Sequence, residues 1–376
     1  MSKKYSTWQI AATFVGTVVG AGFASGQELL QFFGYFGFIG VIGLALTTVL
    51  LIFFGYIVLK LGYKLQAESH LPVMNFAGGR WVGRTVDIIT TFFLFGVLAV
   101  MAAGSGAVFR QEFGLSTLLG SSLLIGLSLI TVLLGINRVI EAISFVAPIL
   151  VFSVLSISFY TIVKNFPVLL TNLSWSEPLN AAAPNWLLAA LLYTSYNLVL
   201  AIAVLAPLGA LAKENKLLPG AILGGGSLGF SAMAITLALI ATAPAVTALE
   251  VPMLHIAGNL SPVFRTLYGV VLLAEVYTTG VSSLYGFAAR LTKPNTKKFR
   301  LLAMGTSFVA LVASQFGFSQ LVSILFPLVG YGGLVLLGAL AFYFLKTQFQ
   351  DVQLPFLRYQ PAPALKPLKN DNKKEK

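Results

Sequence analysis

Residues 16–28 read Gly16-Thr17-Val18-Val19-Gly20-Ala21-Gly22-Phe23-Ala24-Ser25-Gly26-Gln27-Glu28 and interrupt the first long apolar run of the chain. Three glycines within seven positions weaken a helix, and Ser25 followed by Glu28 has the spacing of a capping box, which marks a new helix start. A helix that stops and restarts inside a bilayer leaves backbone N–H and C=O groups that lipid cannot bind, so such breaks line a cavity or a ligand. The segment is therefore a candidate binding site.

The composition is typical of an integral membrane protein. Of 376 residues, 57% are hydrophobic and only 10% are charged, whereas soluble domains carry about 25% charged residues. Apolar runs of about 20 residues, long enough to cross a bilayer as a helix, occur near 8–34, 37–60, 86–110, 116–135, 139–163, 185–211, 217–243, 262–289, 299–316 and 319–345. None alternates as the strands of a membrane β-barrel do. We expect an all-α integral membrane protein with ten transmembrane helices.

The distribution of Lys and Arg along the chain is typical of a membrane protein rather than of a protein that binds nucleic acid. With a cytoplasmic N-terminus, only Arg110, Lys164 and Arg265 of the 24 Lys and Arg residues fall outside the cell. The positive-inside rule therefore favours an even number of spans, with both termini in the cytoplasm of a cell-membrane protein. The chain contains no cysteine, which excludes disulfides and Cys-based metal sites.

The ten spans divide into two halves. We expect a first repeat at 1–163, an extracellular connection at 164–184, a second repeat at 185–346 and a disordered, basic, Pro-rich cytoplasmic tail at 347–376. Span centres in the second half follow those of the first at an offset of about 180 residues, and five spans per half invert the second copy. A 5+5 inverted repeat is typical of secondary transporters, which bind substrate where discontinuous helices meet.

The sixth span should then be interrupted as the first one is. Its centre carries a polar cluster, Tyr193-Thr194-Ser195-Tyr196-Asn197. Ser, Thr and Asn compete for backbone hydrogen bonds and favour caps and turns. We interpret the cluster as an unwound segment; a continuous helix with interhelical polar contacts is the alternative.

Two carboxylates lie inside predicted spans, Glu28 and Glu275. An ionisable side chain at that depth is a functional candidate, because an unpaired charge there is costly. As the last residue of the capping box, Glu28 can also simply bond the backbone of Ser25, and the two roles are compatible.

Glu275 is followed by hydroxyl side chains. Three of them share its helix face: Thr278, Thr279 and Ser282. The group offers oxygen ligands to a cation, or hydrogen-bond partners to a carboxyl that carries a proton. A purely structural hydrogen bond between Glu275 and the hydroxyls is the alternative.

The first break also offers two opposite dipole ends. The half-helix before it ends in carbonyls near 16–19, and the half-helix after it begins with N–H groups near 22–26. Carbonyl ends favour a cation and N–H ends favour an anion such as a carboxylate. One interrupted helix can thus hold both partners of a symport reaction.

The string from Gly16 to Phe23 resembles the first-helix signature of the amino acid–polyamine–organocation (APC) superfamily, and the longer string to Glu28 resembles the YkvI-like permease family. The span count and the repeat are similar to the LeuT fold. This resemblance implies that backbone at Gly20, Ala21 and Gly22 receives a substrate carboxylate, while the sixth-span cluster faces the amine or side chain. The rest of the break completes the expected substrate site: Phe23, Ala24, Ser25 and Gly26.

In sodium-coupled members of the fold, a cation lies between first-helix carbonyls and paired hydroxyls of the eighth helix. The matching positions here are Gly16, Val19, Thr278 and Thr279, which make a possible sodium site. The chain departs from the pattern at Glu275, where a small residue is expected, so that both sodium and proton coupling stay open.

We therefore expect a cation-coupled symporter of a small zwitterion, such as an amino acid, that works by alternating access and needs no cofactor. The alternative is a membrane receptor that keeps a transporter fold but senses its ligand. No Ser/His/Asp constellation or metal-ligand cluster is found in the sequence, which argues against an enzyme.

Overall fold

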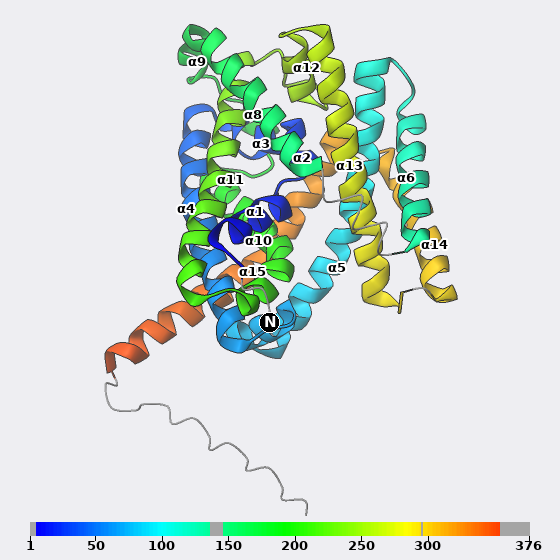
Figure 1. The fold of residues 1–376 in the computed structure, drawn as a ribbon. Coiled ribbons are helices and arrows are strands. Elements are labelled where there is room, and N and C mark those ends of the chain that lie inside the picture. The colour runs from blue at the N-terminus through cyan, green and yellow to red at the C-terminus, as the bar shows by residue number, and fades with distance from the viewer. Residues whose placement is uncertain (1–4, 136–145, 295, 354–376) are drawn as a thin grey trace, which may run out of the picture.

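The computed structural model describes residues 5–135, 146–294 and 296–353. The predicted tail from 354, the N-terminal Lys3 and Lys4, and the start of the predicted fifth span with Arg138 lie outside the described residues. The long helices form one bundle, and the chain begins with three short helices, α1 (Thr7–Val18), α2 (Ala21–Ser25) and α3 (Gln27–Phe32) (Figure 1). Helices α2 and α3 are buried, whereas α1 has an exposed face that includes Trp8. The long helices are α4 (Gly37–Leu65), α5 (His70–Phe113), α6 (Thr117–Leu134), α8 (Val146–Lys164), α10 (Trp186–Leu211), α11 (Glu214–Thr242), α13 (Pro262–Leu291), α14 (Lys297–Ser314) and α15 (Phe318–Gln353).

Shorter helices lie mostly in the connections between these. They are η1 (Gly34–Phe36), α9 (Phe166–Asn172), η2 (Pro178–Asn180) and α12 (Pro252–Gly258). Within the described residues, seven helices are long and apolar enough to cross a bilayer, or eight if α8 and α9, bent by 86°, form one broken span. The predicted first span is divided among α1, α2 and α3, and α14 is less apolar because Lys297, Lys298 and Arg300 lie in its first turn.

The break in the first span is confirmed. Helix α1 ends at Val18, Val19 and Gly20 are extended, and α2 begins at Ala21. A second break follows at Gly26, whose φ of 80° lies in the left-handed region that favours glycine. The capping prediction is correct only in part: Ser25 Oγ accepts a hydrogen bond from Gln27 N at 3.2 Å, but the Glu28 side chain turns away, toward α10.

The predicted break in the sixth span is wrong. Helix α10 runs from Trp186 to Leu211 without interruption. Two of its polar side chains bond carbonyls one turn back on the same helix: Thr194 Oγ1 donates to Ala190 O at 2.8 Å, and Asn197 Nδ2 donates to Tyr193 O at 2.9 Å. The helix therefore satisfies the hydroxyl and amide donors itself and need not unwind to do so.

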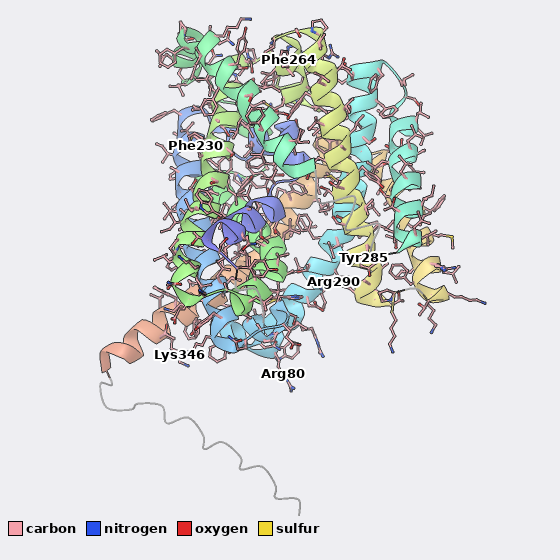
Figure 2. All side chains as sticks on the ribbon, viewed as in Figure 1. Arg80, Phe230, Phe264, Tyr285, Arg290 and Lys346 are labelled. Atoms are coloured by element: carbon pink, nitrogen blue, oxygen red, sulfur yellow. The ribbon has the colours of Figure 1, made fainter. Side chains whose placement is uncertain are left out.

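Two ion pairs attach the two ends of α13 to α5. At one end Arg265 Nε lies 2.6 Å from Glu112 Oε2, and at the other Arg290 Nη1 lies 2.5 Å from Asp87 Oδ1. Figure 2 shows Arg290 at the same lower end of the bundle as Arg80 and Lys346. Double attachment keeps the α5–α13 pair in register over the depth of the bundle.

Helices α4 and α10 approach so closely that only glycine fits between them. A Cβ atom built on Gly209 of α10 would collide with the carbonyl oxygen of Leu59. The reciprocal contact joins Gly62 of α4 to the carbonyl of Ala206. Small residues at such crossings let helix backbones pack directly in a membrane protein.

We expect Gly209→Ala to lower the free energy of unfolding by about 1–3 kcal/mol, because the added methyl group meets backbone that cannot move aside. Thermal unfolding of the detergent-solubilised protein measures this. Gly226→Ala on α11 is the matched control, since a Cβ there meets nothing within 4 Å. Equal melting temperatures for the two variants would contradict the close approach.

Candidate functional site

A cavity of about 150 Å³ lies at the break between α1 and α2. Its walls come from the broken first span, α5, α10, α13 and α15, which are distant from one another in the sequence. The lining residues are Gly16, Thr17, Val18, Val19, Gly20, Ala21, Gly22, Glu28, Phe93, Val97, Met101, Tyr196, Asn197, Leu200, Glu275, Thr278, Thr279, Ser282 and Phe326. The cavity thus unites the candidate residues of the first, sixth and eighth predicted spans.

The backbone at the break contributes polar groups to the cavity. The last carbonyls of α1 and the first N–H groups of α2 have no partners inside their own helices, as at every helix terminus. Helix α1 is closed by a 2.8 Å hydrogen bond from Val19 N to Val15 O, and α2 opens with Ala24 N donating to Gly20 O at 3.0 Å. Val19 and Gly20, which lie between the two helices, both line the cavity.

Glu28 is buried and bound from one side. The hydroxyl of Tyr196 donates a short hydrogen bond to Glu28 Oε1, which connects α3 to α10. The other oxygen, Oε2, lies against Gly22, where an added Cβ atom would be only 2.6 Å away. The Glu28 carboxyl group therefore lies directly over the start of α2, at the place where the sequence predicted a substrate carboxylate.

Glu275 is only 5% exposed and faces the same cavity from α13. Thr279 Oγ1 donates to Glu275 Oε1 at 3.4 Å, while Thr278 Oγ1 donates to the backbone oxygen of Glu275 at 3.0 Å. Ser282 Oγ donates to Thr279 O at 2.9 Å. Each hydroxyl proton is used within the helix, so the hydroxyl oxygens keep lone pairs for a cation in the cavity.

All four residues of the predicted sodium site line this cavity. Gly16 and Val19 contribute from the end of α1, and Thr278 and Thr279 contribute from α13. In the part of the chain that the structure describes, no group of three or more His, Cys, Asp and Glu side chains could hold a metal ion. Any cation here would depend on hydroxyl and backbone oxygens together with one or two carboxylates.

Several predicted substrate residues do not line the cavity. Phe23 is buried, Ala24 O accepts a hydrogen bond from Tyr268 of α13, and Ser25 Oγ donates to Gly22 O at 2.9 Å. Gly26 lies against other buried side chains: Met253 and Leu239.

In α10 the cavity receives only two members of the predicted cluster, Tyr196 and Asn197. Thr194 bonds its own helix, Ser195 Oγ donates to Gly330 O of α15 at 2.5 Å, and the buried hydroxyl of Tyr193 has no partner among the described residues. A helix presents only one face to the cavity, and this one faces it with Tyr196, Asn197 and Leu200.

The apolar wall of the cavity was not predicted from the sequence. Three residues come from α5, namely Phe93, Val97 and Met101; Leu200 comes from α10 and Phe326 from α15. The rings of Phe93 and Phe326 meet edge to face at 5.6 Å, and Tyr196 lies 5.2 Å from Phe326. Apolar residues occur throughout these spans, so no sequence signal separated the ones that line the cavity.

Comparison with known proteins identifies the family. No protein-family model matches the chain. YkvI, an uncharacterized membrane protein of Bacillus subtilis (strain 168), is 32% identical over 344 residues, which cover 90% of this chain and 96% of YkvI. The chain belongs to the family of YkvI.

Solved structures show the fold that this family shares with transporters. MhsT, in complex with L-phenylalanine, superimposes with a TM-score of 0.61 at 16% identity, covering 89% of each chain. A Na⁺-coupled sialic acid symporter in a substrate-bound outward-open state gives a TM-score of 0.59 at 14% identity, covering 84% of this chain and 75% of the symporter. At such identities the likeness is one of fold.

The absence of native cysteine permits a direct test of the lining. We expect Ser282→Cys, which introduces a thiol on the cavity face of α13, to react with a small water-soluble methanethiosulfonate. The neighbouring variant Ser283→Cys should react much more slowly, because Ser283 is 3% exposed and is not among the lining residues. Labelling of the two purified variants is compared by mass spectrometry. Equal rates would contradict the assigned face.

Proposed function

We propose that this protein is a cation-coupled symporter of a small zwitterionic solute, with an amino acid as the first candidate, and that it works by alternating access. The observation that carries the proposal is a cavity in which a broken membrane helix meets two buried carboxylates, Glu28 and Glu275. A cavity of this kind can hold a polar solute away from lipid.

The architecture supports transport. We propose ten spans in a 5+5 inverted repeat of the LeuT type, within the APC superfamily, with α1 to α3 together as the first span. Both termini would lie in the cytoplasm of a cell-membrane protein, and the low position of Arg80, Arg290 and Lys346 in Figure 2 is in keeping with the positive-inside rule. The fold likeness to the sialic acid symporter supports the same assignment.

The size of the cavity limits the solute. A volume of about 150 Å³ equals that of an engineered protein cavity that binds benzene, which points to a solute of about six non-hydrogen atoms. Small amino acids have this size, and MhsT, in complex with L-phenylalanine, has the same fold.

The coupling cation would bind beside the solute. Carbonyls near Gly16 and Val19 and the hydroxyls of Thr278 and Thr279 supply oxygen ligands for sodium, and Glu275 lies close enough to Thr279 to share them. A proton on Glu275 is the other form that the coupling cation can take.

Transport is measured with purified protein in proteoliposomes. We expect labelled small amino acids to accumulate above equilibrium when an inward sodium or proton gradient is imposed, because the cavity holds solute and cation together. An ionophore that dissipates the gradient is the control and should abolish accumulation. Binding without accumulation under either gradient would count against transport and favour a receptor.

Glu275→Gln should reduce gradient-driven uptake tenfold or more, because a hydrogen bond to a charged group contributes about 1.5–3 kcal/mol and the amide carries no charge. The melting temperature should change little, since Gln still accepts the bond from Thr279. Glu68→Gln, an exposed carboxylate between α4 and α5, is the matched control. Unchanged uptake and unchanged pH dependence in Glu275→Gln would remove this residue from the mechanism.

A further inference from the structure

The cavity has an imbalance of charge. Two of its lining side chains, Glu28 and Glu275, are carboxylic acids, and the lining contains no Lys, Arg or His. Buried carboxylates without positive partners are costly in a low-dielectric site. A loaded cavity in which both are ionised therefore needs two positive charges, of which a coupling cation supplies only one.

The two carboxylates have different surroundings. Glu275 lies among hydroxyl and backbone oxygens, which are hard ligands suited to a sodium ion or a proton. Glu28 lies beside aromatic rings: the hydroxyl of Tyr196 bonds its Oε1, and the ring of Tyr196 packs on Phe326 with centroids 5.2 Å apart. Phe93 completes the group, 6.0 Å from Tyr196 and 5.6 Å from Phe326.

We propose that Glu28, together with the aromatic group Phe93, Tyr196 and Phe326, binds the ammonium group of the cargo. The inference rests on the proposed transport function and names its substrate class: small primary amines, with or without a carboxylate. Glu28 is 5% exposed, and the hydrogen bond from Tyr196 engages only one of its two carboxylate oxygens. A carboxylate oxygen and aromatic ring faces are the two kinds of partner that bind an alkylammonium ion.

The same surroundings disfavour a divalent metal ion as cargo. Hard divalent cations take six or more oxygen ligands, either from the protein or as retained waters, whereas the aromatic group around Glu28 supplies only the hydroxyl of Tyr196. Within the described residues no third acidic or imidazole side chain joins these two carboxylates in a metal-binding group. The Glu28 side of the cavity is built for a cation with an apolar surface.

Gly22 is part of the same arrangement. A side chain at this position would place its Cβ atom 2.6 Å from Glu28 Oε2 and 3.3 Å from the ring of Phe326. Glycine therefore lets the carboxyl group lie against the backbone of α2, between the main chain and the aromatic group. Gly22→Ala should push the carboxyl group away from the position in which it meets the cargo.

The test is ligand stabilisation of the purified full-length protein, which needs no transport. Three amino acids of increasing size are each compared with the amine that lacks the carboxylate and the acid that lacks the amine: alanine with ethylamine and propionate, valine with isobutylamine and 3-methylbutanoate, and phenylalanine with phenethylamine and 3-phenylpropanoate. We expect at least one amino acid and its matching amine to raise the melting temperature, while the matching acid does not.

Three results would overturn the inference: stabilisation by acids but not by amines, stabilisation by Mn²⁺ in preference to all amines, or no stabilisation by any amino acid or amine. Because the readout is binding, the proposal can hold even if proteoliposomes show no accumulation, in which case the proposed transport function fails alone. If proteoliposomes show accumulation but the acids that lack the amine stabilise the protein and the amines do not, the ammonium assignment fails alone.

Variants locate the site. Glu28→Gln, which keeps the shape but removes the charge, should weaken binding of the stabilising amine by about 10- to 100-fold, while Glu214→Gln, an exposed carboxylate at the start of α11, should not. Phe326→Leu should weaken binding several-fold through the lost ring face. If Glu28→Gln does not fold, Gly22→Ala gives the second measurement. Unchanged amine affinity in folded Glu28→Gln, or in Gly22→Ala where Glu28→Gln does not fold, would overturn the assignment.

Discussion

Backbone peptide groups must find hydrogen-bond partners where lipid offers none, and this constraint governs the centre of the bundle. Val19 and Gly20 leave the helical conformation in the middle of the first apolar segment. The chain can hold them there only because protein from α5, α10, α13 and α15 surrounds the break and separates it from lipid. The cavity lies where these helices surround the break without filling the space beside it.

The enclosed space then imposes its own electrostatics. Glu28 and Glu275 reach it from α3 and α13, and each is stabilised by a hydroxyl: the phenol of Tyr196 in one case and Thr279 in the other. Neither meets a basic side chain within the lining. When both carboxyl groups are ionised, no basic side chain of the lining neutralises them, and this is the feature on which the proposed cation coupling rests.

The helices around the cavity differ in how firmly they are held. Both ends of α13 are joined to α5 by ion pairs, through Arg265 and Arg290. The short helices of the first span are held mainly by buried contacts such as the hydrogen bond from Tyr268 to Ala24 O. The segmented first span therefore faces this pair of helices across the cavity, and the proposed alternating access would use this difference.

The sequence by itself determined the membrane class, the approximate positions of the apolar segments and the break in the first one, because these depend on hydropathy and on glycine, which act over a few neighbouring residues. It did not determine whether α10 unwinds, since Thr194 and Asn197 could equally bond the backbone one turn back, as they do. Only the tertiary structure decided that Glu28 turns to Tyr196 instead of capping its own helix, and that Phe93 and Phe326 line the cavity. Those outcomes depend on which face each helix presents to segments far away in the chain, and local composition does not encode that register.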